Sequence, residues 1–103
     1  MSFPKHMEIE ADIRAALREV IDPELGFNIV DLGMIYDIDV AESGAVHILM
    51  TTTTRFCPAS GFLQDAVSER ASAVPDVGTV SVELTYDPPW GPEKMTAEIS
   101  AQF

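Results

Sequence analysis

Hydrophobic residues recur along the chain with two different periods, and each change of period marks a new element. Residues 7–21 (MEIEADIRAALREVI) place apolar side chains three and four positions apart, with charged side chains between them. That spacing gathers the apolar residues on one face and predicts a helix. Asp22-Pro23 ends it, because the residue before a proline is pushed out of the helical region of backbone conformation.

Three later stretches alternate apolar and polar residues, which predicts strands with one buried face each. They are residues 34–40 (MIYDIDV), 45–52 (AVHILMTT) and 79–86 (TVSVELTY). In the first of them the alternation puts Tyr36 and Ile38 on the core side and Asp37 on the opposite side. The connection AESG is typical of a hairpin, so the first two strands should be antiparallel.

The remaining segments complete the predicted architecture. Residues 58–74 return to the helical period and predict a second helix. Residues 23–33 are too short for a regular helix and contain Gly26 and Gly33, so they predict an ordered loop or a single turn. Because both helices need an apolar partner, the order α-β-β-α-β predicts an α/β fold: a single two-layer sandwich with the helices packed on one face of a small mixed sheet. We expect one domain over residues 1–103, with residues 1–7 flexible. The pattern leaves open whether the C-terminal tail ends as a helical turn or as an extended edge.

Length, charge and cysteine content narrow the class of protein. The chain has 103 residues, a formal net charge of −11 and six Lys and Arg residues, too few for a basic patch that holds a nucleic-acid backbone. No apolar run approaches the ~18 residues of a membrane span, and the N-terminus has no apolar signal segment. One cysteine cannot form an internal disulfide, which fits a reducing compartment. We therefore expect a cytoplasmic protein that binds neither nucleic acid nor membrane.

The single cysteine, Cys57, follows a run of four threonines and precedes Pro58. Because proline suits the first position of a helix, we expect Cys57 at or next to the N-cap of the second helix. The helix dipole and backbone N–H groups there lower the pKa of a thiol and activate it. The residues alone favour the alternative, a cysteine that packs as a small apolar side chain.

Three blocks of sequence favour a functional thiol at Cys57 over a packing cysteine. VIDPELGFNIVDLGMIYDI (residues 20–38), MTTTTRFCP (50–58) and YDPPWGPEKM (86–95) together resemble the SufT/PaaD-like family of metal–sulfur cluster assembly proteins, which includes the eukaryotic cytosolic iron–sulfur targeting factors. PaaD itself is longer and has a cysteine-rich tail, so the short SufT-like branch is the more similar. The resemblance implies the fold of iron–sulfur cluster assembly domains.

The resemblance also implies a site at the matching positions. The family's site residues fall here on an acidic turn, the end of the threonine run and the thiol: Asp22, Glu24, Leu25, Thr53, Thr54 and Cys57. The chain departs from the family at Thr52, where a leucine is usual, and at Arg55 and Phe56, where a proline and a small residue are common. These departures affect the detailed shape of the site.

The function implied by the resemblance is that of an accessory factor in iron–sulfur cluster assembly or delivery. Its partners would be cluster-assembly scaffold or carrier proteins and iron–sulfur client proteins. A cluster usually takes four thiolate ligands, and this chain has one. We therefore expect no stably bound cofactor and no resident metal, with Cys57 as a ligand of a transient iron–sulfur cluster at most. A homodimer is plausible, because a three-stranded sheet leaves edges to cover.

Two other functions stay open at this point. A small thiol enzyme would use Cys57 as nucleophile, assisted by Glu24 or a threonine hydroxyl, although no general base is placed beside the thiol by the sequence. A structural interaction module would need Cys57 for packing alone. Individual residues are open as well: Asp22 is a ligand or a turn cap, and Trp90 a partner anchor or a cover for the core. We interpret Asp31 as structural and His47 as a surface residue.

Overall fold

The computed structural model describes residues 5–53 and 59–102 of the chain. Its helices are α1 (Lys5–Leu17), α2 (Ser60–Ser72), the 3-10 turn η1 (Pro92–Lys94) and α3 (Ala97–Ser100), and its strands are β1 (Ile35–Val40), β2 (Val46–Met50) and β3 (Val80–Leu84). α1 begins at Lys5, inside the stretch 1–7 for which we expect flexibility, and that expectation stays a prediction. No helix within the described residues is long and apolar enough to cross a membrane.

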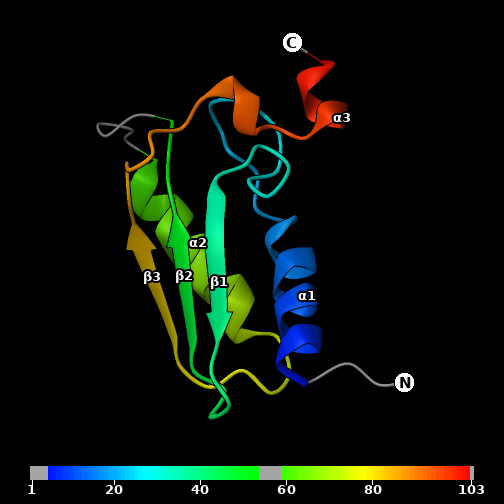
Figure 1. Cartoon of the computed structure of the whole chain (residues 1–103). Coiled ribbons are helices and arrows are strands. Elements are labelled where there is room, and N and C mark those ends of the chain that lie inside the picture. The colour runs from blue at the N-terminus through cyan, green and yellow to red at the C-terminus, as the bar shows by residue number, and fades with distance from the viewer. Residues whose placement is uncertain (1–4, 54–58, 103) are drawn as a thin grey trace.

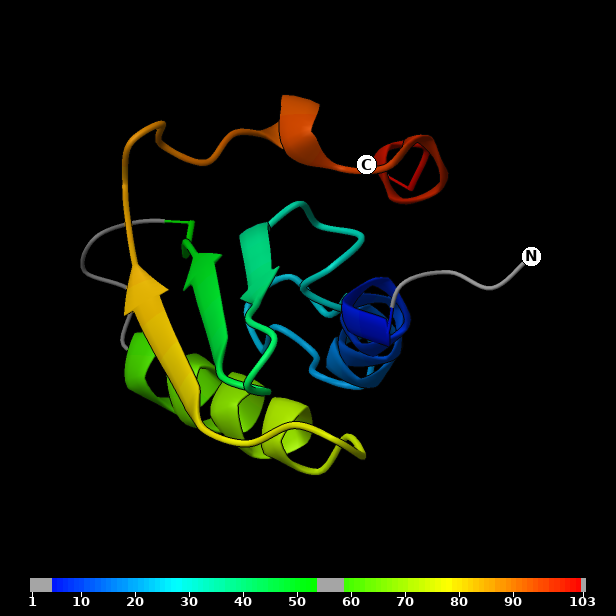
Figure 2. The same ribbon diagram turned by 60° about the horizontal axis from the view of Figure 1, so that its bottom comes forward.

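The strands form one mixed sheet in the order β1-β2-β3. β1 and β2 are antiparallel and joined by a hairpin, whereas β2 and β3 are parallel. A parallel pair needs a crossover connection, which α2 supplies while it covers one face of the sheet. α1 lies beside β1 and against α2 (Figures 1 and 2). The predicted two-layer sandwich with the order α-β-β-α-β is therefore confirmed.

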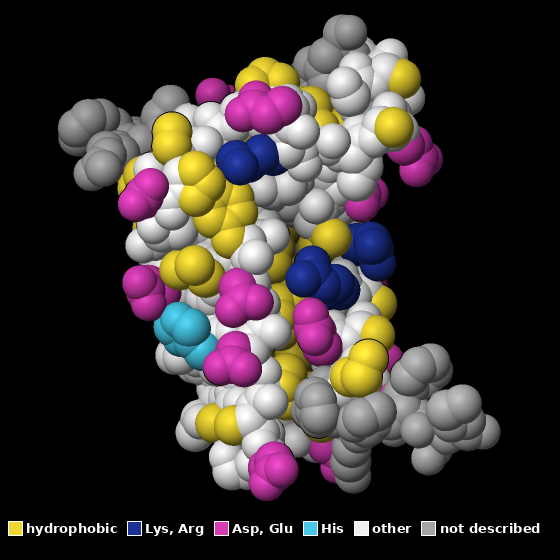
Figure 3. Space-filling view, in the orientation of Figure 1, with side chains coloured by type: hydrophobic (Ala, Val, Ile, Leu, Met, Phe, Trp, Pro, Cys, Tyr) yellow, Lys and Arg dark blue, Asp and Glu magenta, His cyan; other side chains and the backbone are white. Residues whose placement is uncertain are grey.

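The core lies between the sheet and the two long helices. Ile13 and Leu17 from α1, Ile48 from β2, and Leu63 and Val67 from α2 are fully buried. The opposite face of the sheet is open and carries polar side chains, among them His47, whose Nδ1 lies 2.8 Å from Ser81 Oγ and whose Nε2 lies 3.2 Å from a Glu83 carboxylate oxygen (Figure 3). His47 is thus a surface residue with strand partners, as its position in the alternation predicts.

The predicted phase of β1 is wrong at its start. The register between β1 and β2 shifts between Ile35 and Asp37, which is the mark of a bulge. Ile35 therefore turns into the core at 8% exposure, and Tyr36, predicted to face the core, is half-buried instead. An extra residue in one strand leaves no trace in the hydrophobic pattern of that strand alone.

The tail after β3 ends in short helical turns rather than an extended edge. It runs back across the end of the sheet that lies opposite the hairpin and reaches the loop between α1 and β1 (Figures 1 and 2). Ile99 of α3 is buried at 8% exposure and anchors the tail to the core. Residues from the last fifth of the chain thereby cover a loop from its first third.

Candidate functional site

The first part of the loop after α1 is a tight turn built by Asp22. Its Oδ1 accepts hydrogen bonds from the backbone N–H groups of Glu24 (2.7 Å) and Leu25 (3.1 Å). Its backbone carbonyl accepts from Gly26 N (2.8 Å), and Gly26 takes the positive φ of 79° that continues the turn. The sequence Asp-Pro-Glu-Leu-Gly thus folds on itself, and Asp22 caps the turn.

The other carboxylate oxygen of Asp22 has a different environment. The side chain is 0% exposed, and Oδ2 is buried without a hydrogen-bond partner within the described residues. A buried, unpaired carboxylate oxygen is costly, because it has left water without gaining a donor. The turn therefore uses Oδ1 of Asp22 as its acceptor and leaves Oδ2 as a further acceptor.

The threonine run divides between the interior and the surface. Strand β2 ends at Met50, two residues earlier than predicted, and Thr51 and Thr52 are fully buried. Thr51 Oγ1 donates to the Thr52 carbonyl at 3.2 Å, and Thr52 Oγ1 lies 2.7 Å from the Tyr86 hydroxyl. The hydroxyls of both threonines are thus engaged inside the fold.

Thr53 makes the contact that joins two blocks of the predicted site. Its Oγ1 donates to Glu24 Oε2 at 3.3 Å, across 29 positions of sequence. Glu24 is exposed and Thr53 half-buried, so the pair lies where the turn of Asp22 meets the surface. The structure therefore brings Asp22, Glu24, Leu25 and Thr53 together, although their role as a site stays a prediction.

Thr54 and Cys57 lie outside the described residues. Helix α2 begins at Ser60 with Ala59 as its N-cap, two residues after the start that Pro58 predicts, and no side chain caps it. The N-cap of α2 is two residues after Cys57 in the sequence. The expectation that Cys57 stands at or next to the N-cap is therefore wrong. The described chain ends at Thr53 and resumes at Ala59.

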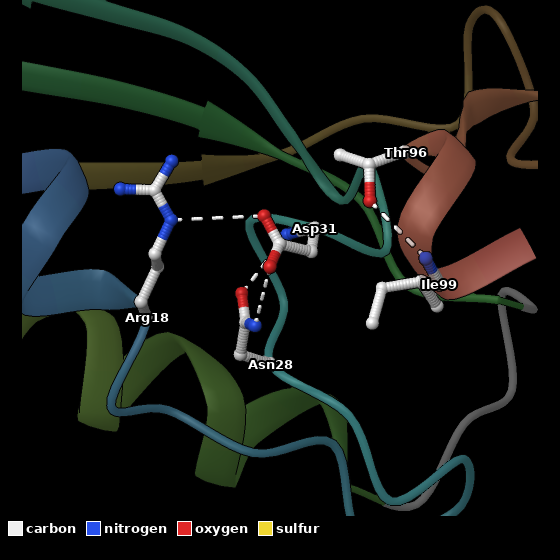
Figure 4. Close-up of polar contacts among 5 residues, drawn as sticks. All are labelled: Arg18, Asn28, Asp31, Thr96 and Ile99. Atoms are coloured by element: carbon white, nitrogen blue, oxygen red, sulfur yellow. Dashed lines mark hydrogen bonds and ion pairs between the residues drawn. The ribbon is translucent and has the colours of Figure 1, made fainter.

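The second part of the loop is braced by an ion pair and by the tail (Figure 4). Asp31 Oδ2 accepts from Asn28 Nδ2 at 2.9 Å, and Asp31 Oδ1 lies 3.6 Å from Arg18 Nε. The Asp31 carbonyl accepts from Thr96 N at 2.8 Å, and Thr96 caps α3 through its hydroxyl, which accepts from Ile99 N. Asp31 is thus structural, as predicted, and its carboxylate contacts the side chains of Asn28 and Arg18.

The tail adds further contacts to the same part of the loop. Trp90 Nε1 donates to the Leu32 carbonyl at 2.8 Å while its ring packs against the core, so Trp90 covers the end of the core. Gly33, at φ 79°, lies directly under the backbone of Lys94, and a β-carbon there would overlap the Lys94 carbonyl. These contacts hold residues 28–34 in place.

Tyr36 ties the bulge of β1 to the tail. Its hydroxyl donates to the Pro88 carbonyl at 2.8 Å, and the Lys94 ammonium lies 5.2 Å from its ring centroid. Burial raises the pKa of Tyr36 above its ordinary value, a hydrogen bond with Thr51 lowers it, and the charge of Glu93 raises it. The net pKa is raised, so the fold favours the neutral phenol.

Sequence reasoning missed Tyr86 as a neighbour of the threonine run. The signal for it was the parallel pairing of the second and third strands, which aligns Met50 with Leu84 and therefore Thr52 with Tyr86. A single sequence predicts neither that pairing nor its register. Within the described residues no three His, Cys, Asp or Glu side chains gather closely enough to hold a metal ion.

The sequence and the fold match those of known proteins. Residues 10–82 match the family model described as "Iron-sulfur cluster assembly protein". The chain belongs to this family. Over 88 residues it is 40% identical to the Fe-S protein maturation auxiliary factor YitW of Bacillus subtilis, with 85% of this chain and 86% of the relative covered.

Two further matches support the membership. The chain is 35% identical to the Fe-S protein maturation auxiliary factor SufT of Staphylococcus aureus over 77 residues, with 75% of this chain and 88% of the relative covered. A crystal structure of a domain of unknown function from Bacillus anthracis superposes with a TM-score of 0.90 at 35% identity, over 95% of this chain and 93% of that one. The resemblance of the three sequence blocks to this family, and the fold it implies, are confirmed.

Proposed function

We propose that this protein is an accessory factor in the assembly of iron–sulfur clusters or in their delivery to client proteins. Membership of the iron–sulfur cluster assembly family supports the proposal, as do relatives named maturation auxiliary factors. A longer relative, the iron–sulfur cluster carrier protein of Mycobacterium tuberculosis, is 37% identical over 84 residues, and the matched part is 22% of its length. A domain of this kind therefore occurs both alone and attached to a carrier.

The finer proposal is that Asp22, Glu24, Leu25, Thr53, Thr54 and Cys57 form one functional site. The observation that carries it is the hydrogen bond between Thr53 and Glu24, which links the acidic turn to the end of the threonine run. Cys57 follows Thr53 by four residues, and four residues of extended chain span at most about 14 Å. The length of the chain therefore allows the thiol to act together with the acidic turn, and the proposal is that it does.

The chemistry of this site suits a short-lived contact with a cluster in transit. A thiolate is a ligand for iron, and one thiol falls short of the four ligands that a cluster usually takes. The cluster would thus be a cargo whose remaining ligands come from the donor or the acceptor protein. Of the two carboxylates in the turn, that of Glu24 is exposed, and its negative charge would attract a metal-bearing partner.

The same features argue against turnover of a substrate. The side chain of His47 contacts Ser81 and Glu83 on the open face of the sheet, so its partners within the described residues do not include the acidic turn. We propose a protein that acts through contacts with scaffold, carrier and client proteins, in the cytoplasm. The small thiol enzyme is the alternative that the following experiment distinguishes.

The test is complementation of a gene deletion in the organism's own cells. The deletion strain receives the wild type, Cys57→Ala or Ser100→Ala, the last an exposed position on α3 that serves as a matched control. Each purified variant is first shown to unfold at the same denaturant concentration as the wild type. An iron–sulfur enzyme and a metal-free enzyme are then assayed side by side, under iron limitation.

We expect loss of the iron–sulfur activity alone, with rescue by the wild type and Ser100→Ala and failure of Cys57→Ala. Equal rescue by Cys57→Ala would overturn the role of the thiol and leave an adaptor that acts through other contacts. An intact iron–sulfur enzyme in the deletion strain would overturn the assembly function itself. Turnover of a small molecule that disappears in Cys57→Ala would favour the thiol enzyme.

A further inference from the structure

The two edges of the sheet are protected to different degrees. The edge at β1 carries a bulge at Tyr36, charged residues at positions 37 and 39, and α1 beside it. β3 forms the other edge, and within the described residues no strand pairs with its far side. Residues 79–85 (TVSVELT) contain no Lys, Arg or Pro, the residues that usually block an edge strand from pairing.

The register shows which backbone groups of β3 are free. Val46 N donates to the Thr79 carbonyl at 2.8 Å, and Thr85 N donates to the Met50 carbonyl at 2.9 Å, so the odd-numbered residues of β3 bond to β2. Backbone direction alternates along a strand. The N–H and C=O groups of Val80, Val82 and Leu84 therefore point away from the sheet.

From this edge we infer that two copies of the chain pair through β3 in an antiparallel, two-fold symmetric arrangement centred on Val82. In that register Val82 lies opposite the partner's Val82, and Val80 opposite the partner's Leu84. The outward groups of both strands then meet in roughly six backbone hydrogen bonds, and two three-stranded sheets become one continuous sheet.

The side chains are self-complementary in the same register. Val80, Val82 and Leu84 are half-buried and point toward the helical layer, so apolar side chains meet apolar side chains across the interface. On the open face the exposed Ser81 lies opposite the partner's exposed Glu83. Glu83, the one charged residue of the strand, thus avoids its own copy and lies opposite the hydroxyl of the partner's Ser81, while both side chains keep their contacts with His47 of their own copy.

The charge of the whole molecule sets the conditions for pairing. Each copy has a formal net charge of −11, so the copies repel one another over a distance that salt shortens. Self-association should therefore strengthen as ionic strength rises. A contact that depended on opposite charges would weaken under the same change.

The experiment is sedimentation equilibrium of the full chain with two opposite substitutions of Ser81. Ser81→Glu sets two pairs of like charges across the interface, whereas Ser81→Lys sets two pairs of opposite charges. We expect the dimer dissociation constant to rise about tenfold with glutamate and to fall about tenfold with lysine. Ser100→Glu and Ser100→Lys make the same changes in net charge on α3, which lies far from β3 (Figure 1). These two control substitutions should change the dimer dissociation constant little.

Amide hydrogen exchange gives an independent readout of the same interface. The amides of Val80, Val82 and Leu84 should become protected as the concentration of the wild type rises, whereas those of Ser81 and Glu83 should be protected throughout. A monomer at every concentration up to about 1 mM would overturn the inference. Equal changes of the dimer dissociation constant in the Ser81 and Ser100 variants would overturn the inference too. So would a dimer in which the amides of Val80, Val82 and Leu84 still exchange rapidly.

Discussion

The loop between α1 and β1 has two halves that the fold treats differently. Residues 28–34 are held from several sides by Arg18, by Trp90 and by the backbone of the tail, and Ile29 and Leu32 are fully buried. Residues 22–26 form a turn capped by their own aspartate and linked to Thr53 by a side-chain contact at the surface. Residues 28–34 therefore anchor the loop to the rest of the fold, while the turn buries the carboxylate of Asp22 and exposes that of Glu24.

The largest effect should come from Gly33→Ala, which tests the braced half. A methyl group there is strained at positive φ and overlaps the Lys94 carbonyl, so we expect a loss of about 3 kcal/mol in unfolding free energy. Gly26→Ala is the matched control, with the same φ of 79° and nothing within 4 Å of the new β-carbon. It should lose about 1 kcal/mol. Urea unfolding measures both, and equal losses would contradict the proposed close packing of the tail.

Asp22→Ala should have the next largest effect and tests the turn. It removes the acceptor of two backbone N–H groups and should lower the unfolding free energy by about 1–2 kcal/mol. Asp22→Asn keeps that acceptor and offers an N–H₂ group in place of the unpaired Oδ2, so its loss should be smaller. Denaturant titrations compare the two. An asparagine variant that unfolds as easily as the alanine variant would show that the charge itself holds the turn.

Tyr36→Phe should cost about 1 kcal/mol at neutral pH, because it removes the hydrogen bond to Pro88. The raised pKa of Tyr36 means that the folded state binds its proton more tightly than the unfolded state does. The stabilisation that protonated Tyr36 gives the folded state is complete below the ordinary pKa of 10.0. It is lost as the pH rises through the pKa that Tyr36 has in the folded state. The difference in unfolding free energy between the wild type and Tyr36→Phe should therefore shrink across that pH range. Unfolding measured from pH 8 to pH 11 would show a constant difference if Tyr36 did not titrate in this way.

Thr53→Val should have the smallest effect on stability, within about 0.5 kcal/mol, because its contact with Glu24 lies at the surface. Its effect on function should be large if the acidic turn and the threonine run act together. The complementation assay measures this, with Thr79→Val as a matched control at the opposite end of the sheet. Full rescue by Thr53→Val would separate the turn from the thiol.

The helices and strands could be predicted from the sequence because their apolar residues follow a local period. Ile13 and Leu17, or Ile48 and Met50, point to the core wherever that core lies. The bulge at Tyr36 could not be predicted, since it depends on which residues of β2 lie opposite. The start of α2 at Ser60 rather than Pro58 likewise shows that a favourable first-turn residue permits a helix without starting it.

The residues of the candidate site come from the resemblance of three sequence blocks, and their geometry could not be predicted from the sequence. The structure brings Asp22, Glu24, Leu25 and Thr53 together, while their role as a site stays a prediction. The burial of Thr52 against Tyr86 and the closure of the loop by Trp90 depend on contacts between distant parts of the chain. Local patterns contain no information on such contacts.

The path of the tail also has a consequence for biosynthesis. Trp90 bonds to a carbonyl 58 positions earlier in the chain, and Thr96 to the carbonyl of Asp31. Contacts over such separations close large loops of chain, so they form late in folding. The loop that carries the acidic turn therefore reaches its final shape only after residues 90–96 have been synthesised. A nascent or truncated chain that lacks the tail would hold the sequence of the acidic turn without the contacts that brace the rest of its loop.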